Sequence, residues 1–233
     1  MTAVLAPNPW LIVVYLLSAV IAVVGVELTP AASQRPHPLT AIFKTLTTVL
    51  LFVLVGKPET RFQVIVEIGF LLSLVGDVAL LFSPDRPDAA HVRSGKIAFG
   101  IGLVGFLFAH VSYIIAFTGV GSWSSRTPIV ALVFAALTGI LFALVWKGSG
   151  DKGVRPAVIV YGVAITTMVV TASMTLGGQL VWAMPAAIGA VLFYVSDSSL
   201  SLNAFRREIP HAQFLTMGVY WLGQLGIALA ARA

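Results

Sequence analysis

Long apolar stretches, each of about twenty residues, alternate with short polar stretches along the whole chain. About 20 residues of α-helix are needed to cross the roughly 30 Å hydrocarbon layer of a membrane, so each stretch has the length of one span. Backbone groups find no water in that layer and must bond to one another, which makes a helix the default. The pattern predicts eight transmembrane helices, at 9–28, 38–56, 62–82, 97–119, 127–147, 154–175, 180–202 and 211–231.

The composition is that of a membrane protein and excludes several other classes. Of the 233 residues, 58% are hydrophobic and only 10% are charged, whereas a soluble domain carries roughly 25% charged residues. The polar stretches are too short to hold a soluble domain, so we expect residues 1–233 to form one integral-membrane domain, a single all-α bundle. The sequence has no cysteine, which excludes disulfides, thiolate chemistry and metal sites with cysteine ligands.

The basic residues are distributed unequally between the two sides of the predicted bundle. The stretches after the first, third, fifth and seventh spans hold nine of them: Arg35, Arg86, Arg93, Lys96, Lys147, Lys152, Arg155, Arg206 and Arg207. The opposite side holds four: Lys57, Arg61, Arg126 and Arg232. Cytoplasmic loops are enriched in Lys and Arg. We therefore expect the richer side to face the cytoplasm and both termini to lie on the non-cytoplasmic side.

Few ionisable side chains fall inside the predicted spans, and four polar groups fall at similar depths. A charge inside a membrane is costly, so such residues usually face the bundle interior and serve a function. Asp77 and Asp197 each lie five residues before the end of their spans, roughly 8 Å from the cytoplasmic boundary. Lys44 and Tyr161 lie six and seven residues into spans that begin on the same side. We expect these four residues in one layer, although equal depth does not establish contact.

Two other ionisable residues lie at different depths, and structural roles remain open. His110 is about fourteen residues into the fourth span and is expected deeper, and Glu67, roughly 15 Å from Asp77, is left out of the candidate site. An intramembrane aspartate can simply pair with a lysine and hold helices together. Lys44 can extend toward the interface, and His110 can bridge helices.

The residue types in this layer are those of acid–base catalysis. Of two carboxylates that share a buried site, one tends to keep its proton while the other stays ionised beside a cation. No histidines have the HExxH spacing of zinc hydrolases and no GxSxG sequence is present, so these two hydrolase classes have no support. We expect neither a metal nor an organic cofactor.

The third and seventh spans contain similar five-residue sequences near their ends. GDVAL (76–80) and SDSSL (196–200) both read small residue, Asp, two residues, Leu. The two spans are four apart and are predicted to run in the same direction, which is the relationship expected of a parallel four-plus-four repeat.

Six segments, in order over almost the whole chain, are similar to a known family: FKTLTT (43–48), LSLVGDVALLF (72–82), FGIGLVGFLFAHVSYI (99–114), YGVAITTMV (161–169), GAVLFYVSDSSLSLNAF (189–205) and YWLGQLGIAL (220–229). Together they resemble the YhhN-like lysoplasmalogenases, multispan proteins related to the animal transmembrane lysoplasmalogenases. The resemblance implies hydrolysis of the vinyl ether bond of a lysoplasmalogen, a lysophospholipid-like substrate, to a fatty aldehyde and a glycerophospho-base.

The residue pattern and the resemblance together suggest roles in that reaction. Asp77 and Asp197 are predicted to be the catalytic acid and base, in an order that the sequence leaves open. Lys44 is predicted to tune their protonation or to hold the substrate phosphate, and Tyr161 and His110 to orient substrate or water. Three further residues of the matching segments are predicted to support the site: Tyr113, Ser196 and Tyr220.

Two other functional classes remain open from the sequence. Acidic residues within spans and a parallel repeat also fit a small proton-coupled transporter, and a non-catalytic lipid-binding protein would use the aspartates structurally. The expected partners are a lysophospholipid or plasmalogen-like substrate and the surrounding membrane lipids, without nucleic acid. We expect the protein in the plasma membrane of a bacterium, with its site facing the cytoplasmic half.

Overall fold

The computed structural model describes residues 8–28, 36–83, 92–148, 155–178, 180–206 and 211–232, which form eight α-helices and one short 3-10 turn. The helices are α1 (Pro9–Glu27), α2 (Pro38–Val55), α3 (Arg61–Leu81), α4 (Val92–Val120), α5 (Thr127–Gly148), α6 (Arg155–Met174), α7 (Ala183–Phe205) and α8 (Ala212–Arg232), with turn η2 (Thr175–Gly177) after α6. All eight are long and apolar enough to cross a membrane. The prediction of an all-α protein with eight spans is confirmed.

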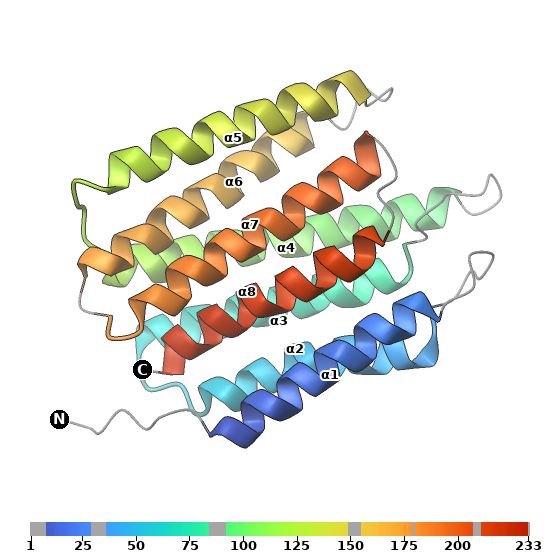
Figure 1. The fold of residues 1–233 in the computed structure, drawn as a ribbon, viewed down its shortest axis with the longest axis horizontal. Coiled ribbons are helices and arrows are strands. Elements are labelled where there is room, and N and C mark those ends of the chain that lie inside the picture. The colour runs from blue at the N-terminus through green and yellow to red at the C-terminus, as the bar shows by residue number, and fades with distance from the viewer. Residues whose placement is uncertain are drawn as a thin grey trace.

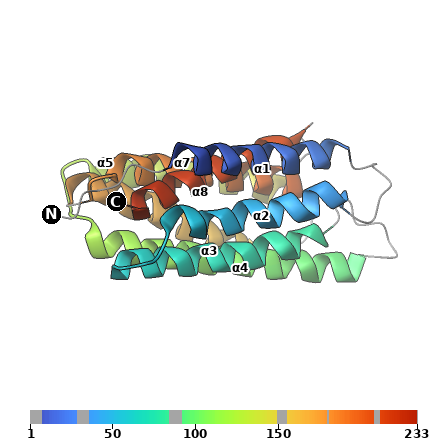
Figure 2. The same ribbon diagram turned by 90° about the horizontal axis from the view of Figure 1, so that it is seen from below.

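The helices lie side by side along one direction and form a flattened bundle (Figure 1). Figure 2, viewed at right angles, shows α1, α5, α7 and α8 toward one side and α2, α3 and α4 toward the other. The most extensive helix pairs are α3 with α4 and α7 with α8. Within the described residues, α5 packs only on α6 and α7, so it lies at the edge of the bundle.

Glycines bring the most extensive helix pairs to backbone distance. A Cβ atom added to Gly105 on α4 would lie 3.0 Å from the backbone nitrogen of Gly76 on α3. One added to Gly223 on α8 would lie 2.8 Å from the carbonyl oxygen of Gly189 on α7. Small residues at such crossings allow helices to associate in lipid, where the hydrophobic effect provides no driving force between them. Gly76 directly precedes Asp77, so the tight α3–α4 crossing lies beside the predicted site.

Two helices extend further than the apolar pattern predicts. α4 begins at Val92, five residues before the predicted start at 97, and α7 ends at Phe205, three residues after the predicted end at 202. The apolar pattern reports the segment that fits in hydrocarbon, and a helix can continue beyond it through polar residues such as Lys96. The other helix ends agree with the prediction to within three residues.

The first and last helices run antiparallel. Glu27 at the end of α1 lies 3.1 and 3.2 Å, through its two carboxylate oxygens, from Nδ1 of His211, which directly precedes α8. Pro9 and Arg232 therefore lie at the same end of the bundle (Figure 1). Which end faces the cytoplasm stays a prediction. Of the cations that support it, several lie outside the described residues: Arg35, Arg86, Lys152, Arg207 and the side chain of Arg93.

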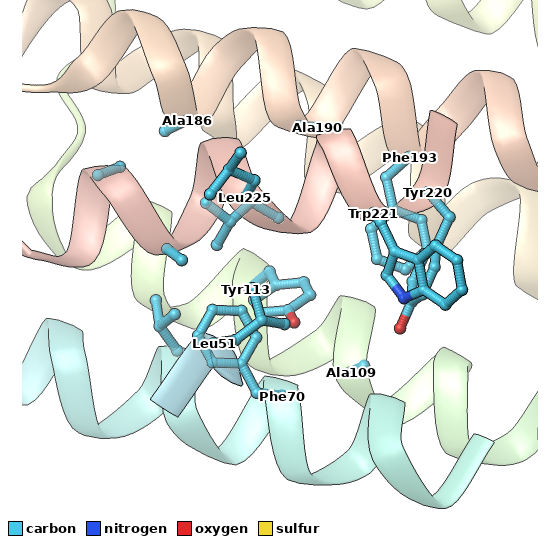
Figure 3. Packing of buried hydrophobic residues seen from close by; sticks show 14 of the residues in the cluster. Leu51, Phe70, Ala109, Tyr113, Ala186, Ala190, Phe193, Tyr220, Trp221 and Leu225 are labelled. Carbon is cyan, nitrogen blue, oxygen red and sulfur yellow. The ribbon is translucent and has the colours of Figure 1, made fainter. Parts of the chain in front are cut away.

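Aromatic rings fill the middle of the bundle around Phe193 of α7. Its ring centroid lies 5.1 Å from that of Tyr220 and 4.8 Å from that of His110, both in edge-to-face contact. Figure 3 shows Phe193, Tyr220 and Trp221 gathered together among the buried residues. Edge-to-face pairs have a preferred geometry as well as a large buried area. This cluster therefore holds α4, α7 and α8 in a defined relative position next to the predicted site.

Candidate active site

Asp77 on α3 lies at the centre of a polar cluster inside the bundle. Its Oδ1 atom is 3.4 Å from Nζ of Lys44 on α2. Its Oδ2 atom accepts hydrogen bonds from the hydroxyls of Thr48, at 2.7 Å, and Tyr220, at 2.9 Å. Only 2% of Asp77 and 7% of Lys44 is exposed. Three donors, one of them cationic, are the surroundings that a buried carboxylate needs in order to compensate for lost hydration.

A chain of hydrogen bonds leads from α4 through α8 to Asp77. The Tyr113 hydroxyl donates to Oε1 of Gln224 at 2.8 Å. Nε2 of Gln224 donates to the Tyr220 hydroxyl at 3.1 Å and to Oγ of Ser73 at 3.0 Å. Tyr220 in turn donates to Asp77. Along the path from Tyr113 through Gln224 and Tyr220, each donor points toward the Asp77 carboxylate, which is the acceptor at the end of the chain.

Three members of this cluster are absent from the sequence-based list of site residues, although their spacing marks them. Thr48, Ser73 and Gln224 each lie four positions from a listed residue, namely Lys44, Asp77 and Tyr220. Residues four apart share one face of a helix. Polar residues at this spacing within an apolar span indicate a helix face turned toward the bundle interior, and this signal was available in the sequence.

Asp197 on α7 has different neighbours. Its Oδ2 atom accepts a hydrogen bond of 2.5 Å from the Tyr161 hydroxyl on α6 and lies 3.5 Å from Nε2 of His110 on α4. His110 is fully buried. The main chain of Phe106, one turn earlier, lies near its ring, yet neither ring nitrogen has a partner with hydrogen-bond geometry among the described residues. Within the same part of the chain, no lysine or arginine forms an ion pair with Asp197.

His110 contacts Asp197 despite its greater predicted depth. The predicted span placed Asp197 five residues from the helix end, whereas α7 continues to Phe205 and places it eight residues, roughly 12 Å, from that end. Depths counted along separate helices from their predicted ends do not refer to a common plane. The expected difference in depth therefore does not separate these two side chains.

The phenyl ring of Phe193 links the Asp77 cluster to the Asp197 cluster. Phe193 contacts Tyr220, which donates to Asp77, and also contacts His110, which adjoins Asp197. The structure thus brings together most of the predicted site residues, as two adjoining clusters.

Corresponding helices supply the partners of the two aspartates. Asp77 on α3 is reached from α2 by Lys44 and from α8 by Tyr220. Asp197 on α7 is reached from α6 by Tyr161 and from α4 by His110. In a parallel four-plus-four repeat, α2 corresponds to α6 and α8 to α4. The two clusters therefore occupy equivalent places in the predicted repeat, while duplication itself stays a prediction.

An apolar groove leads to Asp197 between α4, α5, α6 and α7. It is open to the surroundings, and the free space inside it, about 30 Å³, is small compared with a typical small-molecule site. Its polar residues are Tyr161, Asp197, Ser198 and Ser201, and its apolar ones include Leu103, Leu141, Phe142, Val158, Ile165 and Phe205. Asp77 does not line this groove. A molecule in the groove therefore meets the Asp197 cluster directly.

Other polar residues lie away from the two clusters or serve packing. Ser196, predicted to support the site, donates its hydroxyl to the main-chain carbonyl of Thr216 on α8 at 2.9 Å. The Tyr194 hydroxyl lies 2.9 Å from Oγ1 of Thr138 on α5. Glu67, which the prediction leaves out, is half-buried and lies ten residues before Asp77 on α3. No three histidine, aspartate or glutamate side chains gather as metal ligands in the described ranges.

The chain is similar to one known protein family and to several individual proteins. The model of the YhhN family matches residues 39–231. The Dictyostelium discoideum protein named lysoplasmalogenase homolog is 29% identical over 218 residues, which cover 76% of this chain and 66% of that protein. Lysoplasmalogenase TMEM86B of Sus scrofa is 30% identical over 162 residues, 70% of this chain and 61% of that protein. Lysoplasmalogenase TMEM86A of Homo sapiens is 30% identical over 183 residues, 77% of this chain and 68% of that protein.

The chain spans about two thirds of the length of these relatives. No solved structure is significantly similar to it. The region matched by the family model includes both aspartates and every side chain described above as contacting them. With its eight apolar helices and a match that covers most of its length, this integral multi-pass membrane protein belongs to the YhhN family.

Proposed function

We propose that this protein hydrolyses the vinyl ether bond of lysoplasmalogens and releases a fatty aldehyde and a glycerophospho-base. Family relatives at about 30% identity carry the name lysoplasmalogenase. The observation that carries the proposal is the environment of Asp197. This carboxyl group lines an apolar groove open to the surroundings and has no lysine or arginine partner among the described residues. It is thus placed to meet a single-chain lipid.

Asp197 acts as the acid in the proposed reaction. Its proton passes to the β-carbon of the vinyl ether, the electrons of the double bond form the new C–H bond, and the ether oxygen shares the resulting positive charge as an oxocarbenium ion. Water adds to the α-carbon and gives a proton to the Asp197 carboxylate. The hemiacetal then collapses: its hydroxyl loses a proton as the aldehyde C=O bond forms, its C–O bond to glycerol breaks, the glycerol oxygen takes up a proton, and the aldehyde leaves. The steps consume one water molecule and restore the acid.

Tyr161 and His110 orient this carboxyl group. Both face the same oxygen of Asp197, Oδ2, from two different helices. A buried imidazole without a hydrogen-bond partner is an unsatisfied polar group, and such a group commonly binds water or ligand. His110 is therefore the residue best placed to hold the attacking water beside Asp197.

Asp77 acts in the proposal as the second, ionised carboxylate. Lys44 contacts its Oδ1 while Tyr220 contacts its Oδ2, so the negative end of the ion pair faces Tyr220 and, beyond it, Phe193. A fixed dipole in a site of low dielectric can stabilise a developing cation without touching it. Because Lys44 is buried against Asp77, this geometry favours its predicted role in tuning the carboxylates over its predicted alternative role of holding phosphate.

The location of the site follows from the same proposal. Asp197, Tyr161 and Lys44 lie in the half of the bundle toward which α3, α5 and α7 run. We infer from the excess of basic residues predicted on that side that this half faces the cytoplasm of a bacterial cell.

The test is aldehyde release from a lysoplasmalogen by the purified protein in detergent, with a metal chelator present. We expect one aldehyde and one glycerophospho-base for each molecule consumed, and no product from the saturated alkyl ether analogue, which has no double bond to protonate. A folded protein that binds the lipid and releases no aldehyde would contradict the proposal and favour the lipid-binding class. Proton-coupled movement of a solute across the membrane of proteoliposomes, without any lysoplasmalogen present, would favour a transporter.

A further inference from the structure

A guanidinium group lies in a second hollow beside the groove at Asp197. Arg155, the first residue of α6, has its Cζ atom 4.2 Å from the ring centroid of Trp146 on α5. Its Nε atom is buried and has no hydrogen-bond partner among the described residues. The hollow is lined by Phe142, Val145, Trp146, Arg155, Val158 and Ile159. A buried N–H group without a partner is costly, so this guanidinium is ready to accept an anionic ligand.

The hollow and the groove adjoin. Phe142 and Val158 line both of them. Arg155 precedes Tyr161 by six residues on α6, which corresponds to roughly 9 Å along the helix. On the facing helix α7, Ser201 lies one turn beyond Asp197, toward the same end of the bundle, and its side chain lines the groove. A polar path thus leads from the Asp197 carboxyl toward the end where Arg155 lies.

The rise of roughly 9 Å along α6 between Arg155 and Tyr161, which contacts Asp197, is comparable to a length within the proposed substrate. In a lysoplasmalogen, seven bonds join the β-carbon of the vinyl ether to the phosphorus atom. An extended chain advances about 3.5 Å for every three bonds, so the two atoms lie about 8 Å apart. We propose that Arg155, held against Trp146, binds the phosphate of the lysolipid while Asp197 meets its vinyl ether. This assignment rests on the proposed hydrolase function.

Arginine suits this role better than the lysine predicted from the sequence. A guanidinium presents several N–H donors in one plane, binds phosphate oxygens in pairs, and stacks on an aromatic ring without losing those donors. Trp146 is about half exposed near the end of α5, where an indole is commonly found at a membrane interface. The alkenyl chain would then extend the opposite way, past Leu141 and Ile165 of the groove.

The kinetic test compares two substrates that differ only in the phosphate group. Arg155→Gln should raise KM about tenfold or more for lysoplasmenylcholine, and should change KM less than about twofold for 1-O-alkenylglycerol, which has the same vinyl ether and no phosphate. Arg155→Lys should recover part of the loss, because it restores the charge without the planar donors. An equal loss on both substrates, or no loss on the phosphate-bearing one, would overturn the assignment.

A binding test separates this inference from the proposed reaction. The probe is a radiolabelled 1-O-alkyl lysophosphocholine, whose saturated ether cannot be hydrolysed by this route, compared with 1-O-alkylglycerol in equilibrium dialysis. Arg155→Gln should weaken binding of the phosphate-bearing lipid alone. The matched control is Lys96→Gln, an exposed cation near the same end of the bundle that lines neither hollow, and it should bind like wild type.

The outcomes of the binding test are distinct. Selective loss in Arg155→Gln without any aldehyde release by wild type would support the phosphate site and refute the hydrolase. Aldehyde release by wild type with unchanged lipid binding in Arg155→Gln would refute the phosphate site alone. Displacement of the lipid by micromolar inorganic phosphate would identify a site for free anions and overturn the assignment to a lipid phosphate.

Discussion

The ammonium group of Lys44 lies 3.4 Å from the carboxylate of Asp77, in the interior of a bundle whose outer surface is apolar. A buried ion pair is costly to form and more costly to break on one side. Asp197, in the adjoining cluster, has a tyrosine and a histidine in place of the lysine. Two carboxylates at corresponding places in the predicted repeat thus have unlike surroundings, which is how one site can provide both an ionised carboxylate and a proton donor.

Replacement of Asp197 by Asn should abolish turnover without unfolding the protein. Asparagine has nearly the same shape but cannot transfer an acidic proton to carbon, and loss of a general acid costs about 10²- to 10⁴-fold in rate. Aldehyde release measured beside the elution profile of the purified protein checks this. Glu67→Gln is the matched control, since it neutralises a half-buried carboxyl outside both clusters. Near-normal activity in Asp197→Asn would remove Asp197 from the mechanism.

The Asp77–Lys44 pair should be needed for activity beyond its contribution to stability. Removing one partner, in Asp77→Asn or Lys44→Met, leaves the other buried without its ion-pair partner and should cost about 3–5 kcal/mol in the free energy of unfolding. The double variant Asp77→Asn/Lys44→Met removes both charges and should regain most of that stability. Thermal unfolding in detergent measures this part of the prediction.

Activity of the double variant decides between the structural and the catalytic role of Asp77. We expect it to stay below about one hundredth of the wild-type rate, because stability returns while the negative charge does not. A double variant that is both stable and active would show that the pair only holds α2 and α3 together.

Tyr161→Phe should lower kcat while leaving the fold intact. The phenol hydroxyl donates to Asp197 Oδ2, and a hydrogen bond to a charged group contributes about 1.5–3 kcal/mol, equivalent to roughly 10- to 100-fold in rate. Tyr194→Phe is the comparison, because that hydroxyl contacts Thr138 and neither aspartate. Steady-state kinetics on both variants tests the prediction. Equal effects of the two substitutions would argue against a specific role for Tyr161.

Filling the groove should weaken substrate binding. Ala157 lines the groove on α6, and Ala157→Phe would occupy part of its volume, with an expected increase in KM of about tenfold. Val160→Phe adds a ring to an exposed position on the same helix that does not line the groove, and its KM should stay near that of wild type. If Val160→Phe raised KM and Ala157→Phe did not, the lipid would have to enter elsewhere.

Several features of the protein could be predicted because they depend only on the position of residues along the chain. Span number and span length follow from hydrocarbon thickness, whereas the depth of Asp197 counted from the predicted span end differs from its place in α7, which continues to Phe205. Burial of a charged group in lipid is costly enough that polar residues inside spans indicate the bundle interior. These arguments singled out both aspartates and, among the side chains that surround them, Lys44, Tyr161 and His110. Tyr220 was predicted only from the segments that resemble the family.

The amino-acid sequence by itself therefore determined the eight helices and the ionisable residue types that lie within them. The tertiary structure alone decided that Lys44 pairs with Asp77 while Asp197 meets Tyr161, His110 and the groove. The physical reason is that lipid and protein interior are equally apolar. On α5, for example, exposed Leu132 and buried Val145 have similar side chains, so hydrophobic patterning hardly reports how a spanning helix is rotated. Rotation is set by small residues and rings from distant parts of the chain, such as the Gly189–Gly223 crossing and the ring of Phe193, and only their packing brings the two clusters next to one another.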